Sequence, residues 1–548
     1  MIVIRCMFCL GYETIGFLQM ASRFRRFSTL FFHRSKHVKV PLVAASCYIA
    51  GLAYARSFTS ESTLLHAQST PEIVVAPQSL VRRKNLADFD KDYKILSKLG
   101  EGGFANVYKV QQKSTGFLRT AKIVKFHSQS EADVFKNEVD IMTQLDSPYI
   151  ARIVEYYTES GLSNGWSPGN QGIIVYHFID GDDLLDSINE RITTNGSFTD
   201  TEIRSIVRQI LKSLQYLHAK NYVHGDVKPE NFIVSSDKTS RMILKLIDFG
   251  LSSHDRLNGA DIQKAGTSFY MAPEAFSRKE GEYSGKSDSW SVGVIFATIV
   301  SRGTALLGRV TSCNTREPIQ AIDSSFVEDE LVKLEKEGVP TTYIDLIGRL
   351  LSHDPKDRIS TADALNDPLM AGSYKFDPSF GPNLAKSING IQRFSELPIF
   401  SRLIRLVAAH QINDADVPET RMVFRCLDVD ADGLVSIENV LSGNFISGEK
   451  PSQALSICDM RGIGNKFGFE DFIAASMPII SDEHLEAIFH EIDTNNRGHI
   501  NAETLAVFFS QSGFSINTGN QLISSCNNVL HRKVRYLDLD AFKRCVAG

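Results

Sequence analysis

One short polar stretch limits the folds open to this chain more than any other feature. It spans residues 224–231, with the sequence HGDVKPEN, and residues 248–250 add a second acidic signature, DFG. An amphipathic segment at 203–217 precedes the stretch, and apolar runs at 232–234 and 242–247 follow it. This pattern predicts a polar loop held between a helix and two short strands.

The residue types in this loop indicate phosphoryl transfer. That chemistry needs a carboxylate to orient the attacking hydroxyl, a cation to neutralise the migrating charge and oxygen ligands for Mg²⁺. We expect Asp226 to accept the hydroxyl proton and Lys228 to neutralise the phosphoryl charge. Asn231 and Asp248 are the expected Mg²⁺ ligands. A polar surface loop is the alternative, which the flanking helix and strands disfavour.

A glycine-rich stretch nearer the N-terminus predicts a nucleotide site. Residues 100–107 read GEGGFANV. Gly100, Gly102 and Gly103 would let backbone amides approach phosphates that a Cβ atom would obstruct. Val107, at the start of the following strand, completes the expected contacts of this turn.

Taken together, these motifs make residues 93–370 resemble a protein kinase domain. The resemblance implies a bilobal α+β fold with ATP and Mg²⁺ as cofactors. It also implies that Lys122 clamps the ATP phosphates and that Glu138 is its ion-pair partner. Lys125 is the competing lysine, but the spacing of Lys122 from Val107 and the Ile-Val-Lys after it fit the family better.

The resemblance places the hinge between two lobes after an apolar strand at 173–178. Tyr176 then takes the gatekeeper position, where it would narrow the pocket behind adenine. Asp183 matches the acidic residue that binds the ribose or a basic substrate, and with Glu230 it favours basic residues before the target serine or threonine. A helix N-cap is the alternative role for Asp183.

Other positions of the kinase pattern indicate scaffold contacts. Glu274 has its expected partner in Arg358, and Asp288 fits the residue that braces the catalytic loop. Gly225 replaces the arginine usual before the catalytic aspartate, so a phosphorylated activation segment would lack its main cation. Lys245 and Arg256 are the candidate replacements for that cation. We therefore expect control of activity to come from elsewhere in the chain.

Residues 1–60 differ in composition from the rest, because they are basic with Glu13 as their sole acid. Such leaders resemble organelle transit peptides, and the uncharged run at 40–55 is shorter than the roughly 20 residues of a membrane span. A targeting segment, a membrane anchor and a disordered extension all remain open. The expected location is intracellular, either cytoplasmic or, if the leader functions, membrane-anchored or organellar. Residues 61–92 read as a linker.

Residues 419–548 are expected to form an all-α domain of four EF-hand repeats at roughly 35-residue spacing. Two loops keep acidic residues at ligand positions. The expected Ca²⁺ ligands are Asp428, Asp430, Asp432 and Leu434 in the first loop, and Asp493 and Asn495 in the other. Position 12, normally a bidentate glutamate, is Asn439 or Thr504, so calcium should bind weakly.

Residues 371–418 are the expected junction between these domains, with an autoinhibitory role. From 394 to 412, apolar residues at helical spacing alternate with Arg402 and Arg405, as in a helix that occupies a hydrophobic groove. An ordinary packed helix is the alternative.

Kinase domain, junction and four EF-hand repeats in this order resemble the calcium-dependent protein kinase family. The resemblance implies ATP-dependent transfer to serine or threonine of protein substrates, with contact between the kinase and EF-hand domains. A pseudokinase scaffold and an EF-hand adaptor are the alternatives. The net charge of -5 argues against nucleic-acid binding, and the eight scattered cysteines are read as reduced thiols.

Overall fold

The computed structural model describes residues 80–101, 105–159, 167, 169–194, 196–236, 242–254, 270–276, 284–302, 324–371, 381–436, 466–477, 480–509 and 516–547. The expected leader at 1–60 and the EF-hand position Asn439 lie outside these residues. Within the described ranges, no helix is both long and apolar enough to cross a membrane.

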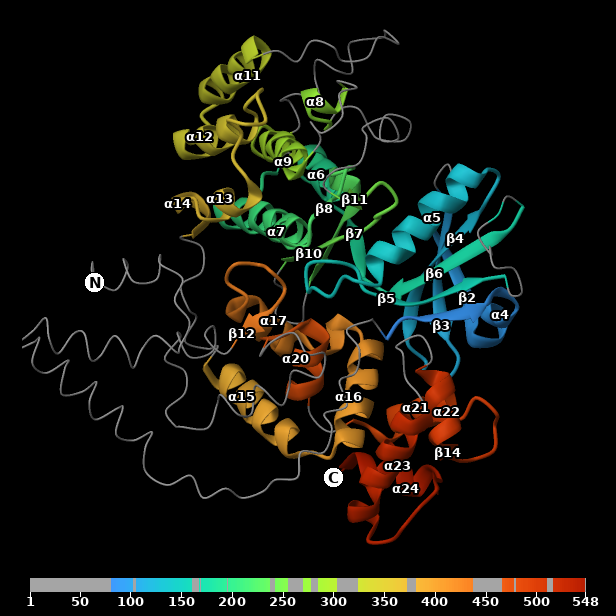
Figure 1. Cartoon of the computed structure of the whole chain (residues 1–548). Helices are drawn as coiled ribbons and strands as arrows, with labels where there is room; N and C mark the ends of the chain where they lie inside the picture. Colours follow the sequence, from blue (N-terminus) through green and yellow to red (C-terminus); the bar gives the residue numbers. More distant parts are fainter. Residues whose placement is uncertain are drawn as a thin grey trace, which may run out of the picture. The chain divides into compact units, whose positions relative to one another are not determined.

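The smaller lobe is built on a six-stranded sheet in the order β1-β5-β6-β4-β3-β2. Helix α5 (Gln129–Met142) lies against one face of this sheet (Figure 1), where Phe135 and Val139 pack in one apolar core with Ile174. Ser128 caps α5 by accepting a hydrogen bond from the Glu131 amide. The strands are β1 (Arg82–Asn85), β2 (Tyr93–Glu101), β3 (Ala105–Gln112), β4 (Leu118–Lys125), β5 (Ile153–Thr158) and β6 (Gln171–His177).

The larger lobe is mainly helical, and its longest helix is α7 (Asp200–Ala219). A capping box of Thr199 and Glu202 starts α7, which packs against α9 (Gly285–Val300). The two apolar runs after the catalytic loop form β9 (Phe232–Ser236) and β10 (Met242–Leu246), which pair antiparallel. The expected loop between helix and strands is therefore present.

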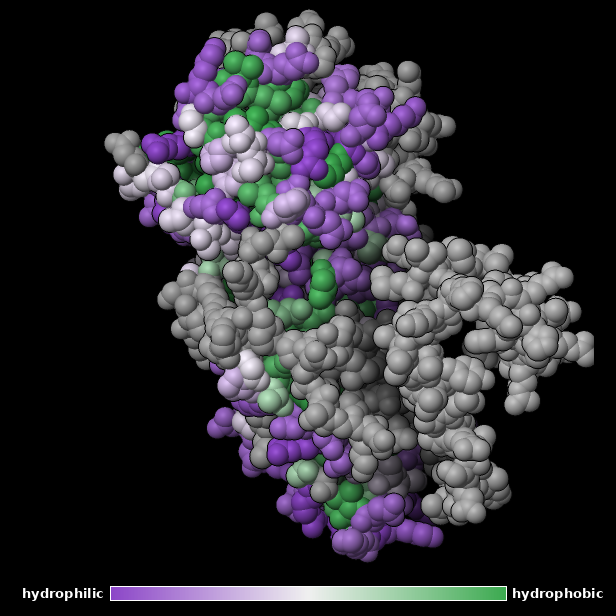
Figure 2. Space-filling model, turned by 90° about the vertical axis from the view of Figure 1, so that its left-hand side faces the viewer, coloured by the Kyte–Doolittle hydropathy of each residue, from purple (hydrophilic) through white to green (hydrophobic). Residues whose placement is uncertain are grey.

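The larger lobe also contains β7 (Gly181–Asp183), α6 (Leu184–Thr193), β8 (Tyr222–Val223), η2 (Pro229–Asn231), β11 (Ser253–His254), α8 (Pro273–Phe276), α11 (Ser324–Lys336), α12 (Thr341–Leu350), α13 (Thr361–Leu365) and α14 (Pro368–Ala371). Figure 2 shows mostly hydrophilic residues on the described surface of one face, with apolar residues between them. Many large apolar side chains of both lobes form one buried core, whereas others, such as Leu99 and Val332, stay exposed.

The linker prediction is wrong for residues 80–92. Strand β1 pairs in parallel with β5 and is followed by η1 (Leu86–Asp88) and α4 (Phe89–Asp92). The basic run is typical of a linker, but Arg82 and Lys84 each lie within 3.1 Å of the buried Glu155 carboxylate. These ion pairs and the strand pairing attach the segment to the small lobe.

In the described part of the C-terminal domain, the EF-hand loops occur in two pairs. In each pair, short strands from the two loops bond antiparallel: β12 (Val435–Ser436) with β13 (Lys466–Phe467), and β14 (Ile500–Asn501) with β15 (Tyr536–Leu537). The described helices are α17 (Pro418–Leu427), α20 (Phe469–Ser476), α21 (Asp482–Ile492), α22 (Ala502–Phe508), α23 (Ile516–Leu530) and α24 (Leu539–Ala547). Their apolar side chains form one core.

The junction contains two helices where the sequence pattern predicted one from 394 to 412. They are α15 (Gly381–Glu396) and α16 (Ile399–Gln411). Pro398 separates them, because proline lacks an N–H and disfavours helical conformation in the residue before it. Helix α16 buries Phe400 and Ile404 in the core of the C-terminal domain. Its apolar face is therefore occupied within this same chain.

Candidate active site

The catalytic loop brings its three expected residues to one point. Lys228 Nζ lies 2.6 Å from Asp226 Oδ2, and the Asn231 amide donates to the Asp226 backbone carbonyl at 2.7 Å. The short helix η2 places Asn231 directly before β9. The Asp226 and Lys228 side chains stay partly exposed, at 13% and 17%. A hydroxyl group entering from solvent can therefore reach a carboxylate that is paired with a cation.

Asp288 of α9 holds the backbone of this loop from inside. Its carboxylate accepts hydrogen bonds from the His224 and Gly225 amides at 2.9 and 3.1 Å, and His218 Nε2 lies 2.8 Å away. Gly225 has a φ of +84°, a region that strains residues with a Cβ atom. The glycine in place of arginine therefore suits the conformation of this loop. The expected scaffold pair is also present, since Arg358 Nη1 lies 2.6 Å from Glu274.

Lys122 links the two lobes at the site. Its Nζ lies 2.8 Å from Glu138 Oε1 on α5 and 2.9 Å from Asp248 Oδ1 after β10. The attraction of Lys122 lowers the pKa of Asp248 to about 2, so this carboxylate is ionised at neutral pH. Lys125, the competing lysine, is exposed at the end of β4. Lys122 is thus the lysine that the fold brings to this site.

The oxygen atoms of Asn231 and Asp248 fit a Mg²⁺ ion. Asn231 uses its amide nitrogen on Asp226, which leaves its Oδ1 as an acceptor. Asp248 Oδ1 accepts from Lys122 and from the Gly250 amide at 3.3 Å, and the side chain is 48% exposed. No described residue donates to Asp248 Oδ2. A carboxylate oxygen and an amide oxygen match the ligand preference of Mg²⁺.

The glycine-rich turn is described at its two ends. Gly100 pairs with Val107 across β2 and β3, and a Cβ atom added to Gly100 would meet nothing within 4 Å. Gly102 and Gly103 lie outside the described residues. The open space above Gly100 is where a phosphate chain would approach the backbone.

Asp183 and Glu230, the two expected acidic contacts, have different surroundings. Asp183 is the N-cap of α6 and accepts a hydrogen bond from the Asp186 amide at 2.9 Å, which favours the capping alternative. Glu230 Oε2 is buried, and it has no hydrogen-bond donor among the described residues. Burial raises the pKa of Glu230. A cation from a bound molecule would supply the donor that this oxygen lacks.

The first EF-hand loop gathers three acidic groups. Ligand oxygens of Asp428, Asp430 and Asp432 lie within 4.8 Å of one another. Asp428 is buried, burial raises its pKa to about 7, and its Oδ1 lacks a described donor. Lys466 Nζ from the next repeat lies 3.3 Å from Asp432, and the Leu434 amide donates to Asp432 at 2.8 Å. The cluster fits a bound cation. The Lys466 ammonium already neutralises part of the negative charge of the cluster.

In the other acidic loop, backbone amides of the loop itself bind the carboxylate of the first ligand position. Asp493 accepts hydrogen bonds from the Arg497 and Gly498 amides at 3.1 and 2.7 Å. Thr504, at position 12, accepts from the Asn501 amide at 2.9 Å and so caps α22. The other expected ligand, Asn495, is exposed. Within the described residues, Asp493 belongs to no cluster of three possible metal-binding acidic side chains.

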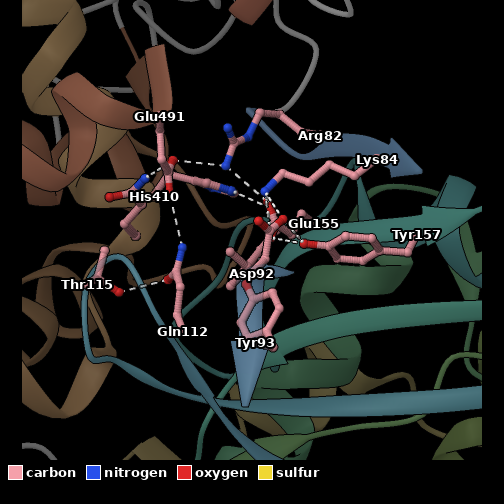
Figure 3. A network of polar contacts seen from close by, with 12 residues as sticks. Arg82, Lys84, Asp92, Tyr93, Gln112, Thr115, Glu155, Tyr157, His410 and Glu491 are labelled. Atoms are coloured by element: carbon pink, nitrogen blue, oxygen red, sulfur yellow. Dashed lines mark hydrogen bonds and ion pairs between the residues drawn. The ribbon is translucent and has the colours of Figure 1, made fainter. Parts of the chain in front are cut away.

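An ion network that no sequence motif indicated joins β1, the small lobe and the C-terminal domain. Arg82 lies between two carboxylates, 3.0 Å from Glu155 of β5 and 2.9 Å from Glu491 of α21 (Figure 3). Gln112 also donates to Glu491 at 2.9 Å. Burial alone would raise the pKa of Glu155, but Lys84 and Arg82 hold it at about 2. Each carboxylate thus receives donors from more than one element.

A second buried set of charges holds the C-terminal end of α16. Arg152 Nη2 lies 2.8 Å from Asp414, and Lys245 of β10 binds the other oxygen of that carboxylate. His177, the residue after the gatekeeper position, has its Nε2 2.9 Å from the His410 carbonyl. Cations at this end also offset the partial negative charge of the helix. Both lobes and the hinge therefore contact the end of α16.

Comparison with known proteins agrees with this geometry. The protein kinase domain model matches residues 93–370. Calcium-dependent protein kinase 22 of Arabidopsis thaliana is 27% identical over 453 residues, covering 80% of this chain and 86% of the relative. Calcium-dependent protein kinase 3 of Plasmodium berghei is 29% identical, covering 77% and 73%. Calcium-dependent protein kinase 4 of Plasmodium falciparum is 26% identical, covering 80% and 83%.

Proposed function

This chain belongs to the protein kinase family, and from that premise we propose that it transfers the γ-phosphate of ATP to serine or threonine residues of proteins. The observation that carries the proposal is the position of Lys122, whose ammonium bridges Glu138 of one lobe and Asp248 of the other. A pseudokinase would not need this bridge together with a partly exposed Asp226–Lys228 pair in the catalytic loop.

The residues of the chain divide the work between positioning and charge stabilisation. Lys122 positions the phosphates, Asp226 orients the substrate hydroxyl and accepts its proton, and Lys228 neutralises charge on the transferred group. Asn231 and Asp248 supply oxygen ligands to Mg²⁺, which when bound offsets the negative charge of the phosphates. In-line transfer then requires little further chemistry from the protein.

Protein substrates with a basic residue near the target serine or threonine fit this site best. The support is Glu230, whose buried Oε2 has no donor among the described residues. An arginine or lysine of the substrate would satisfy that oxygen by a charge-assisted hydrogen bond. Peptide pairs that differ only in one arginine test this, and equal kcat/KM values for both would contradict it.

We further propose that the C-terminal domain is docked on the kinase domain with little dependence on calcium. Arg82 of the kinase side pairs with Glu491 of this domain, and Arg152 and Lys245 bind Asp414 in the junction that leads into it. Neither Asn439 nor Thr504 can offer the two carboxylate oxygens that drive the opening of an EF-hand sensor. The domain then acts as a fixed docking or inhibitory module.

Autophosphorylation by the purified full-length protein tests the enzymatic part of this proposal. We expect incorporation of labelled phosphate from ATP with Mg²⁺, and none in the Asp248→Ala variant. A pseudokinase would bind ATP without transfer, and an EF-hand adaptor would do neither.

For the leader at 1–60, the proposal is targeting or membrane anchoring, and cell fractionation with and without these residues tests it.

A further inference from the structure

Tyr176 lies near the end of β6, the strand that pairs with β4, which carries Lys122. Alternate residues of a strand point to opposite faces of the sheet. Ile174 of β6 belongs to the core that also contains Phe135 and Val139 of α5, and Tyr176 packs against this same core. The ring of Tyr176 therefore lies on the face of the sheet that α5 covers, inside the small lobe.

The Tyr176 hydroxyl donates a hydrogen bond to Glu138 Oε1 at 2.7 Å. The Glu138 carboxylate is 3% exposed. Its other donor among the described residues is Lys122 Nζ, which lies 2.8 Å from each of the two oxygens. Glu138 Oε1 thus receives two donors, one from β4 and one from β6.

This second donor matters because Lys122 is shared between two carboxylates. Asp248 Oδ1 lies 2.9 Å from Lys122 Nζ, about as close as Glu138. A carboxylate bound by Lys122 alone could follow the ammonium or turn away with α5. A hydrogen bond from the central strand β6 fixes Oε1 relative to the sheet, whichever partner Lys122 is facing. Burial raises the pKa of Glu138. The charge of Lys122 lowers this pKa, and the hydrogen bond from the Tyr176 hydroxyl lowers it further.

We propose that Tyr176 is a positioning residue for phosphoryl transfer, because its hydroxyl holds the Glu138 carboxylate where it directs Lys122 toward the ATP phosphates. This inference rests on the proposed kinase activity and adds a role for the gatekeeper side chain beyond the size of the pocket. The ring fills space behind the nucleotide, whereas the hydroxyl acts through Glu138. The two roles are separable, since phenylalanine keeps the ring and removes only the oxygen.

The test compares autophosphorylation rates of wild type and Tyr176→Phe over a range of ATP concentrations. We expect kcat to fall about tenfold, the size of one lost hydrogen bond to a charged group, with KM for ATP nearly unchanged. Tyr222→Phe is the matched control, because the Tyr222 hydroxyl donates to Gln144 at 3.1 Å, and Gln144 is not among the residues that contact Lys122. This control should keep wild-type kinetics.

A double-mutant cycle with Glu138→Gln, followed in single-turnover reactions, tells whether Tyr176 acts through Glu138. In the Glu138→Gln background, Tyr176→Phe should cause little further loss. Wild-type kinetics for Tyr176→Phe, a rise in KM alone, or an undiminished tenfold loss in the Glu138→Gln background would each overturn the inference. An inactive wild-type protein would instead contradict the proposed function itself.

Discussion

Replacing Arg152 with alanine tests whether the end of α16 is locked onto the kinase domain. The Arg152 side chain is 2% exposed and that of Asp414 is 7% exposed. Removing one partner of a buried ion pair costs about 3–5 kcal/mol, because the remaining charge is left unpaired. Lys245 still binds Asp414 in the variant, and His410 still lies 2.8 Å from Glu470. We therefore expect the lower end of that range, about 3 kcal/mol.

Hydrogen exchange on the full-length protein measures this loss. A local cost of about 3 kcal/mol corresponds to roughly 10²-fold faster exchange of amides in the last turn of α16. Arg349→Ala is the matched control, because Arg349 is 42% exposed and pairs with Asp345 and Asp367. Exposed pairs contribute about 0–1 kcal/mol, so exchange in α16 should not change. If Arg152→Ala exchanged no faster than the control, the docking argument would be refuted.

Three further predictions concern phosphate positioning, phosphorylation and pH. Lys122→Met should lower kcat/KM for phosphoryl transfer by misplacing the phosphates, and steady-state kinetics with wild-type values would contradict this. Phosphatase treatment should reduce activity by less than about tenfold, some 1.4 kcal/mol, because Gly225 offers no cation and Lys245 is buried on Asp414. Glu155 has its pKa lowered from 4.5 to about 2, so its contribution to stability is present above pH 4.5 and is lost as the pH falls toward 2. Acid titration followed by circular dichroism should therefore show a smaller acid sensitivity in Glu155→Gln than in wild type.

The sequence predicts those parts of the site whose chemistry lies in short segments. Asp226, Lys228 and Asn231 lie within one segment of six residues. Their motif can therefore be recognised without knowledge of the tertiary structure. Lys122 and Glu138 are found because a strand and the next helix place them at a familiar spacing. The same logic predicts the two acidic EF-hand loops, and the apolar residues Val435 and Ile500 within them lie in the strand pairs β12–β13 and β14–β15.

The contacts between domains could not be predicted in this way. Arg82 and Glu491 are 409 residues apart in sequence, and neither belongs to a motif. A basic run such as 82–84 looks like a solvated linker until a buried carboxylate is placed opposite it. Pro398 itself indicates the break between α15 and α16. The helical spacing of the apolar residues on both sides of it nevertheless favoured one continuous helix. Asp183 shows the opposite case, since its capping role follows from local sequence.

The most direct test of the central claim is a time course of autophosphorylation by wild type and Asp226→Ala, run in micromolar free calcium and in chelator. We expect wild type to transfer phosphate at rates within about twofold in the two conditions, because position 12 of both acidic EF-hand loops lacks its glutamate. Asp226→Ala should bind ATP but transfer none of it. Substantial transfer by Asp226→Ala would contradict the assigned catalytic loop, and wild-type transfer that requires calcium would contradict the fixed C-terminal module.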